Sequence, residues 1–217
     1  MRFKLTAPSL LAEFIGTYAL VFFGCGAIVL SELEHLSSTV IPLVFGVTIT
    51  LFVYLLGRYS GAHFNPAVTI GFFINKEISV KDSCIYIGTQ ILGGFLASQT
   101  HEALFGRIHS FGVTTLSVDI GQGFFLEAFC TGLLMFVILQ VTREENNIYG
   151  IAIGGTVFIS ALLIGEYTGG SLNPARSIGP ALVSGNTSEI YFYVFAPIIG
   201  SLISSKLFIT KFSKHPK

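Results

Sequence analysis

A twelve-residue template occurs twice in this chain, and its two copies lie 108 residues apart. The copies cover residues 60–71 and 168–179, and both read (Ser/Thr)-Gly-x-x-x-Asn-Pro-Ala-x-(Ser/Thr)-Ile-Gly. A single Asn-Pro pair usually marks an ordinary turn. Two matched copies in 217 residues instead indicate an internal duplication. We predict one domain over residues 1–217, with a first repeat at about 1–110 and a second at about 111–217.

The composition is typical of a membrane protein. Hydrophobic residues make up 52% of the chain and charged residues 11%, and the mean hydropathy is +0.74, whereas soluble domains carry about 25% charged residues. The formal net charge is zero and no block of like charges occurs, so we expect contact with a lipid bilayer and not with nucleic acid. Cys25, Cys84 and Cys130 lie in apolar runs without metal-ligand spacing, which argues against a metal site and a disulfide framework.

Six stretches are long enough to span a bilayer at about 1.5 Å per residue. They lie near Leu10–Leu30, Val40–Leu56, Ser83–His101, Gln122–Val141, Ile148–Ile164 and Ile190–Ile209. We interpret the first as a retained span rather than a signal peptide, because equivalent runs recur along the chain. Three spans per repeat is an odd number, so the second repeat must cross the membrane in the opposite sense. The expected fold is an all-α membrane protein built as an inverted 3+3 repeat.

The segments that follow the two Asn-Pro-Ala tripeptides are too short to span a bilayer. Pro66–Ile74 and Pro174–Val183 are apolar and helix-like, and at roughly 15 Å each would cross half of a hydrocarbon core about 30 Å thick. Short segments interrupted by Gly or Pro at matching positions of two repeats point to a conduction or binding site. We expect two re-entrant half-helices that enter from opposite faces and meet near the midplane.

Basic residues indicate the orientation. Ten of the twelve Lys and Arg residues fall on one side of this topology, and only Arg107 and Arg176 fall on the other. Positive residues collect on the cytoplasmic side of membrane proteins. We therefore expect both termini to be cytoplasmic, in a protein of the plasma (inner) membrane.

The junction of the half-helices is expected to be polar and positive. Asn65 and Asn173 precede prolines, so their side-chain oxygens should cap the half-helices while their NH2 groups offer two donors to a passing water. The hydrogens of that water would then point away, which interrupts a proton wire. Two helix N-termini add roughly +0.5 charge each. At an effective dielectric near 20, a cation about 4 Å away would meet a barrier on the order of 4 kcal/mol.

These residues resemble the paired signatures of the major intrinsic protein family, the aquaporins and aquaglyceroporins, over nearly the whole chain. The resemblance implies a homotetramer with one pore per protomer, passive conduction of water and small neutral solutes, exclusion of protons and ions, and no cofactor. The pore signatures are then Asn65, Pro66, Ala67, Asn173, Pro174 and Ala175. The narrow selectivity filter would comprise Phe45, Ala161, Gly170 and Arg176.

The filter departs from two common forms of the family. Strict water channels usually carry a histidine where this chain has Ala161, and Gly170 is also minimal, so a wider filter is expected. Glycerol facilitators usually carry an aspartate after the arginine, where this chain has Ser177. The residues around Arg176, with Tyr193 in the sixth span, resemble more closely the nodulin-like intrinsic proteins of plants and their bacterial relatives. That subgroup implies conduction of water, glycerol-sized polyols, urea or metalloid hydroxy acids.

Four further polar residues each admit two interpretations. Glu13 and Glu127 are intramembrane carboxylates at matching positions of the repeats; they could form a proton relay, but bracing of the re-entrant loops is favoured. His63 could line the cytoplasmic vestibule or brace the loop by bonding its backbone, and the alternative is a pH gate. Arg176 could pair with a loop carboxylate such as Glu166, although a position in the pore is favoured because an unpaired arginine elsewhere in a membrane is costly.

Other classes of function fit the sequence less well. A secondary transporter shares inverted repeats but normally needs paired charges or ion ligands at the midplane. An ion channel needs rings of charges or carbonyl groups. An enzyme would need a nucleophile–base pair or a metal cluster, which the sequence does not suggest, and an adhesive protein would conduct nothing. A strict water channel stays open as the alternative to a wider solute channel.

Overall fold

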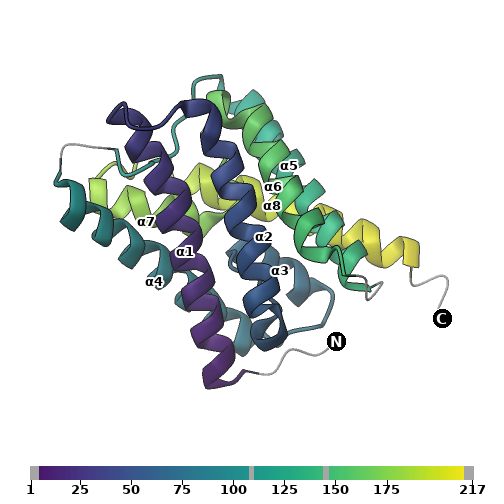
Figure 1. Ribbon diagram of the computed structural model, residues 1–217. Coiled ribbons are helices and arrows are strands. Elements are labelled where there is room, and N and C mark those ends of the chain that lie inside the picture. The colour runs from purple at the N-terminus through teal and green to yellow at the C-terminus, as the bar shows by residue number, and fades with distance from the viewer. Residues whose placement is uncertain (1–4, 108–109, 144–146, 213–217) are drawn as a thin grey trace.

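The computed structural model describes residues 5–107, 110–143 and 147–212. Within these ranges the regular secondary structure is helical, and two series of helices follow one another in the same order of long, long, short and long (Figure 1). The first series is α1 (Ala7–Glu32), α2 (Ile41–Ser60) after a short 3-10 turn (Ser38–Val40), α3 (Pro66–Ile74) and α4 (Val80–Phe105). The second series is α5 (Ile120–Arg143), α6 (Tyr149–Thr168), α7 (Pro174–Ser184) and α8 (Ile190–Phe212).

Most of the long helices have the composition of membrane spans. Among the described residues, five helices are both long and apolar enough to cross a membrane, namely α1, α2, α5, α6 and α8. The predicted span at Ser83–His101 corresponds to α4, which has 26 residues but is less apolar. Its lower hydropathy reflects buried polar residues such as Gln90 and Ser98, which face the protein interior. The predicted all-α membrane fold is confirmed.

Glycine caps, and not the ends of the apolar runs, set where α2 and α6 stop. The two helices end at Gly61 and Gly169, which adopt the left-handed conformation with φ of 83° and 76°. Glycine reaches this conformation without the clash that a Cβ would create. Both are the glycine of the duplicated template. The template therefore ends the second long helix of each half, and a re-entrant loop begins there.

Each short helix packs against the last helix of the opposite half. α3 contacts α8, and α7 contacts α4, beside which it lies in Figure 1. A Cβ added to Gly94 of α4 would lie 2.6 Å from the carbonyl oxygen of Ala175, and one added to Gly179 would lie 2.5 Å from the carbonyl oxygen of Gly94. Small residues permit such close approach of helices in membranes. Each half-helix therefore packs within the opposite half of the chain. This packing holds the two halves together and brings the two templates face to face.

Candidate pore site

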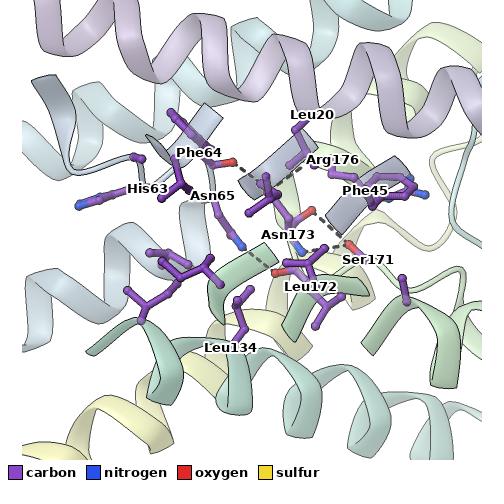
Figure 2. Close-up of a pocket in the computed structure, with 18 of the residues that line it drawn as sticks. Leu20, Phe45, His63, Phe64, Asn65, Leu134, Ser171, Leu172, Asn173 and Arg176 are labelled. Atoms are coloured by element: carbon purple, nitrogen blue, oxygen red, sulfur yellow. Dashed lines mark hydrogen bonds between the residues drawn. The ribbon is translucent and has the colours of Figure 1, made fainter. Parts of the chain in front are cut away.

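The two template loops are joined by a reciprocal pair of hydrogen bonds (Figure 2). Nδ2 of Asn65 donates to the carbonyl oxygen of Leu172, and Nδ2 of Asn173 donates to the carbonyl oxygen of Phe64, each over 2.8 Å. Each asparagine Oδ1 caps its own half-helix by accepting from the backbone N–H two residues further on, over 2.8 and 3.0 Å. An amide NH2 carries two hydrogens. One N–H of each asparagine therefore remains for the cavity, and the other joins the halves, a use that the sequence analysis did not foresee.

The two residues that accept these bonds have a strained backbone. Phe64 and Leu172 occupy the same position in the two templates, and their φ values are 49° and 53°. This left-handed conformation costs a residue with a Cβ about 1–2 kcal/mol. It turns each carbonyl oxygen toward the asparagine of the opposite half. The strain therefore persists because the surrounding contacts fix it.

Two buried carboxylates supply much of that support. Glu13 accepts hydrogen bonds from the backbone N–H groups of His63 and Phe64 over 2.9 and 2.8 Å. Glu127 receives the equivalent two bonds in the second half, each over 2.8 Å, and the first residue of each template adds a hydroxyl donor. A buried N–H without a partner costs about 1–3 kcal/mol. The two carboxylates thus satisfy the donors of the re-entrant loops, and neither of them lines the cavity, which gives a proton relay through the pore no geometric support.

A cavity runs beside this junction and is lined from both halves. The lining includes the residues singled out for the filter and the junction, together with His63: Phe45, Ala161, Gly170, Arg176, Asn65 and Asn173. The prolines and alanines of the two tripeptides instead form the first turns of α3 and α7 and lie outside the lining. Apolar side chains that the sequence analysis missed complete the walls, among them Leu20, Ile49, Leu134 and Val157. Their pattern along the helices is the same as that of ordinary core residues.

Arg176 reaches the cavity from the first turn of α7 and is only 1% exposed. Its Nη1 donates to the carbonyl oxygen of Gly112 over 2.6 Å. Its guanidinium carbon lies 5.2 Å from the centroid of the Phe45 ring, within the range of a cation–π contact. Nε is buried and makes no hydrogen bond within the described residues. The alternative pairing with Glu166 is wrong, because Glu166 is exposed and no ion pair joins the two residues in the described part of the chain.

His63 lines the cavity on the side of α3. Its Nδ1 lies 3.1 Å from the hydroxyl oxygen of Thr69, and its ring stacks on Phe72 with the ring centroids 4.5 Å apart. A second aromatic ring, that of Tyr86, packs edge-on against it. The imidazole is thus held on several sides. This placement fits a wall residue better than a gate that swings through the pore.

Comparison with known proteins agrees with this geometry. The family model described as "Major intrinsic protein" matches residues 3–208. Nodulin-26 of Glycine max is 38% identical over 214 residues, which cover 95% of this chain and 79% of that protein. Glycerol uptake facilitator protein-like 6 of Lactiplantibacillus plantarum is 38% identical over 206 residues, which cover 90% and 94% of the two chains. The X-ray structure of the aquaglyceroporin from Plasmodium falciparum superposes with a TM-score of 0.82 at 27% identity and covers 95% of this chain and 96% of that one.

The helical fold, the paired half-helices and the lined cavity define an integral membrane channel of the aquaporin and aquaglyceroporin class. The chain belongs to the major intrinsic protein family. The resemblance predicted from its duplicated motif is thereby confirmed, and the relatives include both nodulin-like aquaporins of plants and a bacterial glycerol facilitator-like protein.

Proposed function

We propose that this channel passively conducts water and small neutral solutes and excludes protons and ions. The observation that carries the proposal is the reciprocal contact between Asn65 and Asn173 and the opposite loops, which brings two helix N-termini and two amide donors to one level of the cavity. The partial positive charges of the helix ends, together with Arg176, repel cations. Neutral solutes carry no net charge for these groups to repel, so they are not excluded on this ground. The oxygen of a water molecule at this level accepts hydrogen bonds from the two asparagine amides, so its hydrogens point away from the junction. This orientation interrupts the continuous chain of hydrogen-bonded waters along which a proton could move.

The proposed filter is wider than a strict water filter. Ala161 and Gly170 are small and adjacent, since a Cβ added to Gly170 would lie 3.8 Å from that of Ala161. Phe45 gives the filter an aromatic wall, which suits the carbon backbone of a polyol, and Arg176 provides a hydrogen-bond donor, which suits its hydroxyl groups. A relative named as a glycerol uptake facilitator-like protein supports the same solute class. The proposed solutes are glycerol-sized polyols, urea and neutral metalloid hydroxy acids.

The proposed assembly is a homotetramer in the plasma (inner) membrane, with both termini cytoplasmic. Exposed apolar side chains on the long helices, such as Leu51 on α2 and Phe125 on α5, suit burial against lipid or a second protomer. The orientation rests on the distribution of basic residues. Four of those residues lie outside the described part of the chain: Arg2, Lys4, Lys214 and Lys217.

Stopped-flow light scattering on proteoliposomes tests the function. We expect the reconstituted protein to accelerate the movement of water, glycerol, urea and a neutral metalloid acid over empty liposomes without any ion gradient. Dependence on an ion gradient would identify a secondary transporter, and a current across a planar bilayer would identify an ion channel. Passage of water alone would identify a strict water channel.

Mercurial reagents should inhibit this channel poorly. All three cysteines are free thiols, with Cys25 and Cys130 buried and Cys84 exposed, and none of them lines the cavity. A mercurial blocks a pore only if a reactive thiol is accessible there. We expect nearly unchanged water permeability after treatment with mercuric chloride. Strong inhibition that disappears in a Cys25→Ser variant would show instead that this thiol reaches the lumen.

A further inference from the structure

The connection between α4 and α5 enters the protein instead of lying across its surface. Phe111 and Thr114 in this connection are only 1% and 3% exposed. Gly112 lies against α1, since an added Cβ would come within 2.8 Å of the Cβ of Cys25. Phe111 and Gly112 have φ values of 55° and 75°, and this pair of left-handed residues turns the backbone inward. We call residues 110–119 the inserted connection.

The inserted connection makes two polar contacts with the start of α7. The carbonyl oxygen of Gly112 accepts from Nη1 of Arg176 over 2.6 Å. The hydroxyl of Thr114 donates to the hydroxyl oxygen of Ser177 over 2.9 Å. One contact therefore fixes a residue of the proposed filter, and the other fixes the residue that follows it.

Thr114 begins a chain of hydroxyl groups that ends at the cap of α7. The hydroxyl oxygen of Ser177 lies 2.6 Å from that of Ser171, and the Ser171 hydroxyl donates to the carbonyl oxygen of Asn173 over 3.1 Å. A hydroxyl group has one hydrogen. Because Ser171 gives its hydrogen to Asn173, Ser177 must donate to Ser171. The chain thus runs in one direction, from the inserted connection into the re-entrant loop, where Gly170 directly precedes Ser171.

The first half holds its re-entrant loop with a side chain from a membrane helix. Thr69 occupies the template position of Ser177, and its hydroxyl donates to the carbonyl oxygen of Asn65 over 3.1 Å. The donor to Thr69 is Nε2 of Gln90 in α4, at 2.9 Å. Gln90 in the first half therefore has the same task that Thr114 has in the second.

The sequence of α8 explains why the second half needs a different donor. Tyr86 of α4 and Tyr193 of α8 are equivalent, because each donates its hydroxyl to the carbonyl oxygen of the first residue of a template. Four residues further on, α4 has Gln90 and α8 has Pro197. Proline has no side-chain donor. In the first half, Gln90 of α4 donates the hydrogen bond to the template hydroxyl group. In the second half, Thr114 of the inserted connection donates it.

We propose that Thr114 is a positioning residue for the selectivity filter. Through Ser177 and Ser171 it sets the re-entrant loop that carries Gly170, while the neighbouring carbonyl group of Gly112 fixes Arg176. Thr114 does not line the cavity, so its effect on a solute is indirect. This inference rests on the proposed function, since it concerns the selectivity of the same pore.

The ratio of glycerol to water permeability tests the inference. Thr114→Val replaces the hydroxyl group with a methyl group, and we expect the released loop to raise the ratio by about fivefold, the size of effect that the loss of one typical hydrogen bond produces. Thr114→Ser, which keeps the hydroxyl group, should restore the native ratio. Both permeabilities are measured in the same proteoliposomes, so the ratio does not depend on how many channels insert. A merely structural role would lower both permeabilities and leave the ratio unchanged.

Thr115→Val is the matched control, because Thr115 is the exposed neighbour in the same connection and should keep the native ratio. An unchanged ratio in Thr114→Val, or an equal change in Thr114→Ser or Thr115→Val, would overturn the inference. If Thr114→Val gives no flux, Thr114→Ala is measured instead, and loss of insertion in both variants would assign Thr114 a folding role and also overturn it. The native channel is measured first: a native protein that conducts nothing refutes the proposed function, which is a separate result.

Discussion

Proteoliposomes carrying the Glu127→Gln variant should show a water flux at least about tenfold below that of the native protein. The substitution hardly changes the size of the side chain, so the effect arises from hydrogen bonding. Glu127 is fully buried and accepts from the hydroxyl group of Thr168 and from the backbone N–H groups of Ser171 and Leu172. In the variant, an amide NH2 group replaces one carboxylate oxygen. A hydrogen-bond donor then faces the N–H or O–H donors that this oxygen accepted from. Hydrogen bonds to charged groups contribute about 1.5–3 kcal/mol each, so losing them removes a large part of a typical net stability of about 5–15 kcal/mol.

The control for this prediction is Glu166→Gln, which changes an exposed carboxylate of α6 and should leave the flux unchanged. Western blotting and size-exclusion chromatography report how much of each variant inserts and folds. Native water flux in Glu127→Gln at equal insertion would show that the loop does not need the carboxylate. Native water flux with a reduced proton leak would instead support the proton-relay hypothesis, which a pH-sensitive dye inside the vesicles would detect.

The ends of the helices show which parts of the fold could be predicted from residue types. The predicted half-helix Pro66–Ile74 has the same bounds in the structure, because an Asn-Pro pair fixes its start chemically. The predicted span Val40–Leu56 is observed as Ile41–Ser60. The apolar run ends at Leu56, whereas the helix continues to Ser60 and is capped by Gly61. Hydropathy therefore located the spans, and capping residues decide their ends.

The contacts of the pore could be predicted only where a side chain carries the chemistry. Asn173 and Arg176 are visible in the sequence because their functional groups are specific to the residue type. The acceptor for Arg176 is the backbone carbonyl group of Gly112, and every residue has such a group. The role of Thr114 depends on a connection that folds inward at two left-handed residues. No periodic pattern in the sequence indicates this fold. These contacts join parts of the chain that are far apart in sequence, so they required the three-dimensional structure.

Ala161→His should reduce glycerol permeability by about tenfold, equivalent to about 1.4 kcal/mol of added barrier, and leave water permeability within a small factor of native. Ala161 lines the cavity and lies next to Gly170 of the re-entrant loop. The side chain of Gly170 is a single hydrogen, so the loop adds no bulk to the filter at this point. An imidazole at this position would occupy space that a three-carbon polyol needs and that a single water does not. Stopped-flow measurements of both solutes on the same vesicles check the prediction.

Ala161→Ser provides the control, because it adds one small hydroxyl group and should preserve both permeabilities. An equal fall in glycerol and water permeability in Ala161→His would refute the filter assignment, since it would mean that the new side chain disturbs the fold or blocks the whole passage. A fall in water alone would contradict the size argument directly, because the smaller solute would then be the one excluded. Selective loss of glycerol is the outcome expected if Ala161 and Gly170 are what makes this filter wide.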